Sequence, residues 1–523
     1  MASPYSFTLT EDKTIAALNM RGQTATLSAG ATLTVGDGEN PAVVLLTAGN
    51  TSDALITGEG TLDFGTSEGV FVTPVPRSRG SHATLAATIA GSSGVSYHGV
   101  YAGTGNGFWE AVNISGTNTY SGGTRLCGIC AYAKTPKAFS DGTVTLDGGQ
   151  LRGSRLILAA EGLVISNRVV ASGCGGPHYN GMDTTPPGAI NFPGNAELAG
   201  DLHCADRTWI GTYENPGAPY HEGVLSGVVS GESAVILEGS GAIVMTNTNT
   251  VRHAEVYGKL VLRGNAVRPC TEELIFGSTG NGVLRIENTE PITITSRIVG
   301  KGTIELAGSA PVTFTDAYTF RGRIDICGGD REVTGLGDHL TEVVNTTENT
   351  TGLLTLGGKM RLGAVAVGAG VGLAAGGNGG LNFEGSAQTL PSVGGAGRIF
   401  GASLTVTGEI QPGGVDGIGT LTLTAPTTFG SGARLVAEVG GAGVDKLEVR
   451  GDLDISALPL EVKEIGPRSG VNVAGTYLET LGGTISGTFP SVTKPKRGET
   501  EFAATETARM LRYATPGVLL LVR

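Results

Sequence analysis

Aromatic and charged side chains are scarce in this sequence of 523 residues. Aromatic residues make up 5% of the chain and charged residues 16%, whereas glycine occurs 87 times. Runs of Glu, Lys, Gln and Leu, which favour helices, are rare. Short runs of Thr, Val, Ile and Leu are instead separated by Gly, Asn, Asp and Ser, a pattern that predicts many short strands joined by tight turns. Hydrophobic residues make up 40% of the chain, which is enough for a core and argues against disorder.

Positive charge and long apolar runs are also lacking. The net charge of −12 disfavours nucleic acid and anionic membranes as partners. No apolar run approaches the roughly 20 residues that a transmembrane helix needs, so we expect no transmembrane segment. The first residues, MASPYSFTLTEDKTI, show neither the basic nor the apolar region of a signal peptide. Because the composition is that of an exported protein, we expect that an engineered Met has replaced a signal and that the protein is secreted or lies on a bacterial cell surface.

Cysteine is too sparse to provide the framework of the fold. The chain has six cysteines. Cys174 and Cys204 are a candidate disulfide that would close one loop. Cys127 and Cys130 have CxxC spacing without a second such pair, so a local disulfide or free thiols are expected there rather than a zinc site.

Pairs of aliphatic residues recur at intervals through the middle of the chain. The segments GKLVLRG, GVLRIEN, GTIELAG, GRIDICG and GLLTLGG place these pairs at Leu260 and Leu262, Leu284 and Ile286, Ile304 and Leu306, Ile324 and Ile326, Leu354 and Leu356. Their spacing is roughly 20 to 30 residues, which is the range of solenoid repeats. Such a period predicts stacked solenoid coils, because each coil buries its inner face only against its neighbours.

We therefore predict an all-β fold, a single-stranded right-handed parallel β-helix with a loop-rich insertion and a C-terminal cap. An antiparallel β-sandwich array is the alternative, and the scarcity of hairpin signals disfavours it. The expected divisions are N-terminal coils, repeat coils, a loop-rich insertion, the main β-helix and the cap, at residues 1–110, 111–171, 172–223, 224–460 and 461–523.

The predicted insertion carries an unusual density of bulky and polar side chains. The candidate ligand-binding residues are His178, Tyr179, His203, Asp206, Trp209, Tyr213, His221 and Glu222. Aromatic and acidic residues together favour a sugar, whereas histidines with a carboxylate favour a metal. Because neither HExxH nor HxH occurs, we expect no metal and no cofactor. The competing interpretation is a structural loop packed on the rod.

Motifs of known catalytic sites are absent from the sequence. A polysaccharide hydrolase needs carboxylates clustered at the glycosidic bond, and no adjacent Asp pair occurs in the chain. Nor does the sequence contain a Walker loop. We therefore predict no catalytic residues.

One stretch carries a resemblance to a known family. ISGTNTYSGGTRL, residues 114–126, resembles the autotransporter-associated β-strand repeat, also called the passenger-associated transport repeat. Residues 239–264 are similar to a degenerate copy of it. The resemblance implies an adhesin-like right-handed β-helix that is displayed on or released from a bacterial cell, with no catalytic residues. The membrane β-barrel of that family has no counterpart here, so the resemblance is to the secreted form without a barrel.

The Asn and Thr residues of these stretches also invite a ligand hypothesis. For Asn118, Thr119, Asn247 and Asn249 we expect a structural role instead, because asparagine amides can stack in ladders along coils.

These observations predict a non-enzymatic extracellular or cell-surface protein with a structural or adhesive role. Its expected partners are further copies of itself, as a homo-oligomer or filament, or surface glycans. The alternative is a carbohydrate-binding or polysaccharide-degrading β-helix protein that uses the insertion at 172–223.

Overall fold

The computed structural model describes most of the chain. The described residues are 6–47, 53–74, 83–100, 111–147, 154–172, 188–212, 220–264, 268–277, 281–317, 319–320, 323–327, 331–336, 340–345, 353–357, 362–367, 380–390, 393–395, 397–414, 416–466, 472–496 and 498–515. The chain forms two compact units, Met1–Gly282 and Val283–Arg523, here called unit 1 and unit 2. The described residues contain no α-helix, and hence none that is long and apolar enough to cross a membrane.

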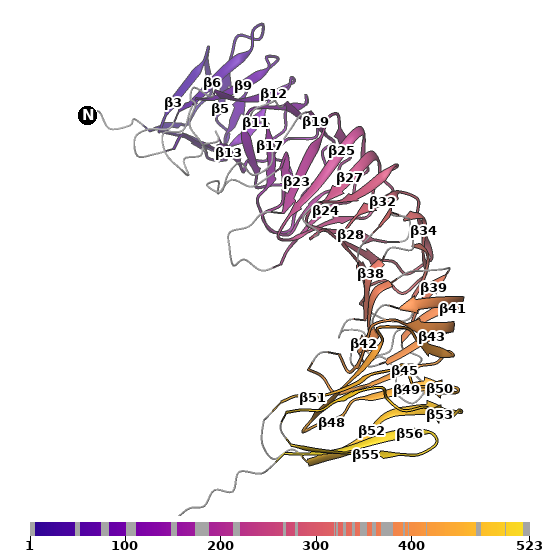
Figure 1. Cartoon of the computed structure of the whole chain (residues 1–523). Helices are drawn as coiled ribbons and strands as arrows, with labels where there is room; N and C mark the ends of the chain where they lie inside the picture. The colour runs from indigo at the N-terminus through magenta and orange to yellow at the C-terminus, as the bar shows by residue number, and fades with distance from the viewer. Residues whose placement is uncertain are drawn as a thin grey trace, which may run out of the picture. The chain divides into compact units, whose positions relative to one another are not determined.

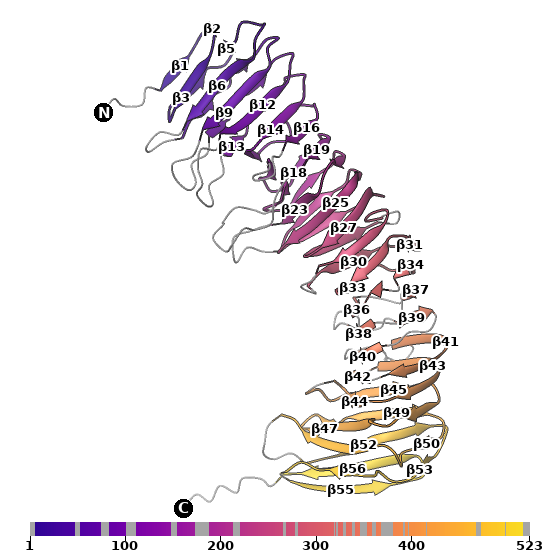
Figure 2. The ribbon, with the colours of Figure 1, turned by 45° about the horizontal axis from the view of Figure 1, so that its top comes forward.

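Unit 1 is a stack of coils whose strands pair in parallel with the strands one coil further along (Figures 1 and 2). Successive coils contribute strands to two long ladders and, in most coils, a further strand to a third side. The first ladder contains β1 (Phe7–Leu9), β4 (Thr24–Leu27), β7 (Leu55–Thr57), β10 (Ala83–Leu85), β13 (Ala111–Ile114), β15 (Cys130–Ala133), β17 (Arg155–Leu158), β20 (Ile190–Asn191) and β23 (Thr208–Thr212).

The second ladder runs along another side of the coils. It contains β3 (Leu18–Arg21), β6 (Ala42–Thr47), β9 (Gly69–Pro74), β12 (Val95–Val100), β14 (Thr124–Cys127), β16 (Val144–Asp147), β19 (Val169–Ser172) and β22 (Leu202–Cys204). The long strand β25 (Val229–Gly239) pairs with both β22 and β23, and is followed by β27 (Thr250–Val256) and β29 (Glu273–Phe276).

The third side of unit 1 is built in two runs. One run contains β2 (Lys13–Ile15), β5 (Thr32–Val35), β8 (Thr61–Asp63) and β11 (Thr88–Ala90). The other contains β18 (Leu163–Ile165), β21 (Ala196–Leu198), β24 (Glu222–Leu225), β26 (Ala242–Met245) and β28 (Lys259–Arg263).

Strand alternation places the core of unit 1 inside the coils. In β4 the side chains of Ala25 and Leu27 are fully buried, while the intervening threonines face outward and are partly exposed. This is the period of two that a strand with one buried face requires. Coil length varies, since the coil from Phe7 to its partner Ala25 is short and the coil from Ile157 to its partner Asn191 is much longer. The added length lies between β19 and β20, largely outside the described residues, and the strands on either side of it remain paired in their ladders.

Unit 2 contains two long ladders. The first contains β30 (Val283–Glu287), β33 (Thr303–Leu306), β36 (Arg323–Ile326), β38 (Leu340–Asn345), β40 (Leu362–Val367), β42 (Val393–Gly395), β44 (Glu409–Pro412), β47 (Arg434–Gly440), β51 (Leu460–Glu464) and β54 (Val492–Thr493). The second contains β31 (Ile292–Ile294), β34 (Val312–Ala317), β37 (Arg331–Leu336), β39 (Leu353–Gly357), β41 (Gly380–Leu390), β43 (Gly397–Val406), β45 (Thr420–Leu423), β49 (Lys446–Arg450) and β52 (Asn472–Leu481).

Shorter strands complete unit 2. β32 (Arg297–Gly300) pairs with β35 (Thr319–Phe320), β46 (Thr427–Phe429) pairs with β43, and β50 (Leu453–Asp454) pairs with β53 (Ile485–Ser486), all in parallel. The antiparallel pairs join β47 to β48 (Gly443–Val444), and join β56 (Ala508–Ala514) to both β52 and β55 (Glu499–Ala504). The last described strands of the predicted cap thus end the parallel stack with antiparallel strands.

The strand pairings confirm an all-β parallel β-helix. The antiparallel sandwich alternative is wrong, because every ladder of unit 1 and both long ladders of unit 2 are parallel. Within the predicted insertion, the described residues form β20 to β23 and continue the ladders.

The predicted aliphatic pairs lie largely where they were expected. Leu260, Leu262, Leu284, Ile286, Ile304, Leu306 and Ile324 are buried, and β30, β33 and β36 pair in register. The last segment differs, because β39 pairs with β37 and β41 in the other ladder. The strand that follows β36 in its own ladder is β38. Each coil has more than one strand, and the last interval in the sequence joins strands on different sides of the coil. That interval is therefore longer than the others.

The stretch 114–126 is a turn between β13 and β14 that is bound to the coils on both sides. Asn118 is buried; its Oδ1 accepts the backbone N–H of Ile89 at 2.9 Å and its Nδ2 donates to the carbonyl of Ala138 at 2.6 Å. Gly122 lies against backbone, since a Cβ there would be 2.3 Å from the nitrogen of Gly94. The motif therefore has the structural role expected for its asparagine.

Candidate functional site

The described candidate residues of the sequence lie on different sides of the coils in unit 1. His203 belongs to β22 in the second ladder, Trp209 to β23 in the first, and Glu222 to β24 in the third. His178, Tyr179 and Tyr213 lie outside the described residues, as does Cys174, the proposed disulfide partner of the buried Cys204. The strands therefore do not bring His203, Trp209 and Glu222 into one pocket.

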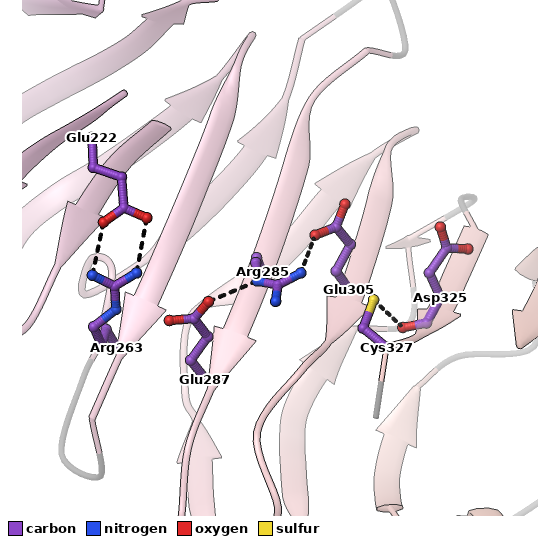
Figure 3. A network of polar contacts seen from close by, with 7 residues as sticks. All are labelled: Glu222, Arg263, Arg285, Glu287, Glu305, Asp325 and Cys327. Carbon is purple, nitrogen blue, oxygen red and sulfur yellow. Dashed lines mark hydrogen bonds and ion pairs between the residues drawn. The ribbon is translucent and has the colours of Figure 1, made fainter. Parts of the chain in front are cut away.

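Two of these residues have structural contacts. His221 is buried, and its Nε2 lies 2.8 Å from the carbonyl of Phe192, which assigns the ring proton to that nitrogen. Arg263 donates two hydrogen bonds to Glu222, of 2.8 and 2.9 Å (Figure 3). Such a bidentate pair fixes both side chains and joins two strands of the third ladder across β26.

His203 and Asp206 lie near Trp209 in sequence but make local contacts. The Nδ1 atom of His203 is 3.2 Å from the hydroxyl of Ser230. Asp206 accepts the backbone N–H of Arg207 at 2.7 Å. Neither contact indicates a metal site, and the described residues hold no group of three or more His, Cys, Asp or Glu side chains that could bind a metal ion.

Trp209 is part of an aromatic and ionic cluster on the outer face of unit 1. The rings of Trp209 and Tyr257 are nearly parallel, with an interplanar angle of 20° and centroids 6.4 Å apart. The guanidinium carbon of Arg207 is 5.7 Å from the Trp209 ring centroid, within the range of a cation–π contact. Nη2 of Arg207 donates to both oxygens of Glu255, at 2.9 and 2.7 Å. We call Arg207, Trp209, Glu255 and Tyr257 the aromatic patch.

The register of the strands builds the aromatic patch. Trp209 on β23 pairs with Ile236 on β25, and Ile236 pairs with Glu255 on β27. Ile236 is fully buried although its position in the strand faces outward, opposite to the core residues Val235 and Leu237. The Arg207–Glu255 pair spans the coil that contains Ile236, so the patch covers an apolar side chain.

Further charged residues flank the aromatic patch. Arg252 forms an ion pair with Glu272, with 2.9 Å between Nε and Oε2. His253 lies 3.7 Å from Glu272 and 3.9 Å from Glu273. These contacts extend the polar surface along β27 and β29.

The outer face of unit 2 also has ion pairs between strands. Arg285 on β30 donates to Glu305 of the next coil at 3.1 Å, and to Glu287 of its own strand at 2.7 Å (Figure 3). Arg434 contacts Glu409 of the preceding coil and lies 3.5 Å from Glu461 of the following one. Repeated ion pairs along a ladder indicate a stabilised outer surface.

Unit 2 contains a buried polar cluster that the sequence did not predict. Glu438 on β47 is fully buried; its Oε1 accepts hydrogen bonds from Gln411 at 2.8 Å and from Lys463 at 3.0 Å. The bond to Glu438 raises the pKa of Lys463. Lys463 also approaches Asp416 at 3.4 Å.

Asp445 is the second buried carboxylate of this cluster. Its two oxygens accept the backbone N–H groups of Gly419 and Glu438, each at 2.9 Å. Burial raises the pKa of Asp445 to about 7, although these two hydrogen bonds oppose the rise. Asp445 thus links the turn before β45 to β47.

A cavity of about 1090 Å³ lies beside this cluster. Its lining includes Lys463, Asp416, Glu461, Glu464, Lys494 and Lys496. Glu438 and Asp445 are not among its lining residues. The cavity is therefore lined by side chains of both charges, and one of them, Lys463, is hydrogen-bonded to the buried Glu438.

Sequence reasoning found Trp209 but missed its partners. Arg207 lies directly before β23 and two residues before Trp209, a spacing that places both side chains on the same side of an extended chain and is a usable signal. Glu255 and Tyr257 lie two coils further along the chain, and only the coil lengths bring them near. Glu438 had a signal too, since the alternation of Leu435, Ala437 and Val439 places it on the opposite face of its strand.

Among the described residues, the CxxC pair belongs to no group of three or more possible metal ligands. Cys127 is a free, half-buried thiol, and burial raises its pKa. A raised pKa lowers the thiolate fraction that metal binding requires.

Comparisons with known proteins add little to the assignment of the parallel β-helix class. No family model and no curated protein matches this chain. Among solved structures, the crystal structure of the Haemophilus influenzae Hap adhesin is similar to this chain, with 12% identity and a TM-score of 0.22. The match covers 98% of this chain and 64% of that chain, so this chain spans less than two thirds of the adhesin structure. The fold assignment accordingly rests on the strand pairings.

Proposed function

We propose that this chain is a non-enzymatic, secreted or cell-surface protein whose coils present an adhesive surface. The observation that carries the proposal is the aromatic patch, in which Trp209 and Tyr257 are partly exposed on the outer face of paired strands. Tryptophan, tyrosine and arginine are the residues most enriched at the energetic centres of interfaces. Strands in a stacked sheet hold such side chains more rigidly than loops do.

The alternative explanation, that the aromatic patch is a surface in contact with water only, accounts poorly for its composition. A single exposed ion pair contributes about 0–1 kcal/mol to the stability of a protein. This gain is too small to explain why two aromatic rings and a guanidinium cover Ile236. A surface that places an apolar body beside polar tips is suited to contact with another molecule.

An adhesion assay tests this proposal. Fluorescent beads coated with the full chain are applied to intact cells and to extracellular matrix, with albumin-coated beads as the reference. We expect retention above the reference, reduced by W209A. Retention equal to that of albumin on every surface would overturn the adhesive role, and a reducing-sugar product from plant or mucin polysaccharides would favour the degrading alternative instead.

Localisation is tested separately. Antibodies against the purified chain should label intact producing cells or their culture medium. Labelling that requires permeabilised cells contradicts the extracellular assignment.

Self-association is part of the proposal, and a specific edge supports it. Among the described residues, β1, β2 and β3 each pair on one side only. Unpaired strand edges present backbone N–H and C=O groups to another chain. We propose that a second copy pairs with this edge, and sedimentation velocity that shows only monomers at high concentration would contradict it.

A further inference from the structure

We infer that the aromatic patch of Arg207, Trp209, Glu255 and Tyr257 binds an uncharged chain of hexose sugars. The inference rests on the proposed adhesive function and names the chemical class of its ligand. Four features of unit 1 support it: the geometry of the two rings, the hydrogen-bonding groups beside them, the balance of charge around them and the rigidity of their strands.

The two rings form an offset pair with open area. Carbon atoms of directly overlapping rings would approach to about 3.5–4 Å. The centroids of Trp209 and Tyr257 are 6.4 Å apart at an interplanar angle of 20°, so the rings are displaced sideways and each leaves part of its face uncovered by the other. Both side chains are partly exposed. The negative faces of aromatic rings attract weakly positive hydrogens, such as the axial C–H groups of a pyranose.

Polar groups for hydroxyl recognition lie beside the rings, and the Arg207 guanidinium lies over the Trp209 ring with its carbon 5.7 Å from the centroid. Arg207 uses Nη2 for both of its bonds to Glu255, and a guanidinium carries further donors on Nε and Nη1. Glu255 also accepts from the hydroxyl of Tyr257 at 3.4 Å and retains lone pairs for a sugar hydroxyl. A hydrogen-bond donor and an acceptor beside an aromatic face can together bind the two neighbouring hydroxyl groups of a vicinal diol.

The charge around the patch selects against acidic sugars. Arg207 and Arg252 are each paired with a glutamate, Glu255 and Glu272. Glu273 adds a further carboxylate at 3.9 Å from His253. The local charge is therefore close to balanced or slightly negative, and the chain as a whole carries −12. Uronic-acid and sulfated chains would be repelled, which leaves neutral hexoses.

The strands pre-organise the patch for a linear ligand. Trp209 belongs to β23, while Glu255 and Tyr257 belong to β27 or its end, with β25 between them. The Tyr257 ring also lies against the backbone of Gly277, where a Cβ would be 2.4 Å from the ring. Side chains fixed in this way lose little conformational entropy on binding. Successive sugars can then follow the direction in which the coils stack.

The test is affinity electrophoresis of the full chain in gels that contain one polysaccharide each. The neutral probes are mixed-linkage β-glucan, laminarin and galactomannan, and the anionic probes are polygalacturonate and heparin. We expect retardation by at least one neutral probe and by neither anionic probe. W209A and Y257A should each weaken binding about tenfold, whereas W209F should retain part of it.

Tyr132 supplies a matched control. It is a partly exposed tyrosine of the same ladder with Lys134 5.9 Å from its ring centroid, and Y132L should leave retardation unchanged. The thermal midpoint of each variant separates lost binding from lost folding, and W209F keeps the test valid if W209A fails to fold.

Three outcomes would overturn the inference. They are the absence of retardation by every neutral probe, retardation by the anionic probes only, and full binding by folded W209A. If coated beads still adhere in the first case, the adhesive function stands and only its sugar ligand is wrong. If the beads fail as well, both proposals are wrong.

Discussion

At the scale of single residues, buried asparagines connect one coil to the next. The amide of Asn118 joins the coils before and after its own. Asn167 donates to the carbonyl of Gly142 at 2.7 Å, and Asn249 accepts from Val229 and donates to Arg268 at 2.8 and 2.9 Å. Asn288 bonds the carbonyl of Ala310 at 3.1 Å in unit 2. An amide satisfies backbone groups where turns interrupt the strand ladder, because it carries both a donor and an acceptor.

Replacing Asn118 by alanine should therefore destabilise unit 1. The change leaves the N–H of Ile89 and the carbonyl of Ala138 without their buried partner, at a cost of about 2–4 kcal/mol in the free energy of unfolding. Urea denaturation measures the loss as a lower midpoint. N113A is the control, since Asn113 is partly exposed and makes a 3.5 Å contact; its effect should stay within about 0.5 kcal/mol. Equal losses in both variants would contradict the structural role of Asn118.

Asp445 makes the stability of unit 2 depend on pH. Its pKa is raised by burial from 3.8 to about 7 in the folded chain, so between these values the folded state holds a proton that the unfolded state has lost. The contribution of Asp445 to stability therefore falls as pH rises from about 4 to 7 and is constant above that.

The wild type should lose stability relative to D445N over this pH window. Urea midpoints of both proteins, measured at half-unit steps of pH, provide the comparison. D141N, which removes an exposed carboxylate, controls for the loss of one charge. A wild-type to D445N difference that does not change with pH would show that Asp445 is not buried as described.

At the scale of structural elements, glycines allow turns of neighbouring coils to stack. Gly122 and Gly142 have no room for a side chain, because a Cβ on Gly142 would be 2.4 Å from the carbonyl of Gly122. Gly94 likewise faces Gly123. The Ser-Gly-Gly-Thr turn is thus required by the close approach of backbones rather than by a ligand.

G122A should accordingly disrupt the stack. The new Cβ would lie 2.3 Å from the nitrogen of Gly94 and 2.5 Å from the carbonyl carbon of Ser93, so the coils must move apart at a cost of about 3 kcal/mol. The thermal midpoint of the purified variant measures this. G441A provides the control, because a Cβ on Gly441 would have no neighbouring atom within 4 Å. Similar midpoints for G122A and the wild type would refute the close stacking of these turns.

The sequence predicted the positions of the strands well, but it predicted their arrangement within each coil only in part. Period-two alternation identified buried residues such as Leu284 and Ile304, because local geometry alone determines which face a strand side chain occupies. It could not assign β39 to a ladder, because the number of strands per coil depends on where the turns bend. Tyr257 near Trp209 could not be predicted for the same reason, since insertions in turns change the distance in sequence between neighbours in space.

At the scale of the whole molecule, the end of unit 2 differs from the first coil of unit 1. β55 and β56 add antiparallel strands to β52, whereas β1 to β3 pair on one side among the described residues. Antiparallel hairpins at a solenoid end block the addition of a further parallel strand.

Removing residues 498–523 should therefore increase self-association. The truncation exposes the edge of β52, and sedimentation velocity should show larger species whose fraction rises with concentration. The full chain at equal concentration is the reference. A truncated protein whose size distribution equals that of the full chain would show that the hairpin does not protect this end.

The central claim is that successive coils pair in parallel and in register, and a disulfide measures it directly. Val164, Glu197 and Val224 are register partners on three successive coils. Adjacent coils place their Cα atoms about 4.8 Å apart, within the range for a disulfide, whereas two coils separate them by about 9.6 Å. Under mild oxidation V164C/E197C should form the cross-link, identified by mass spectrometry, and V164C/V224C should not. Failure of the first pair, or equal cross-linking of both, would contradict the parallel β-helix on which every proposal here depends.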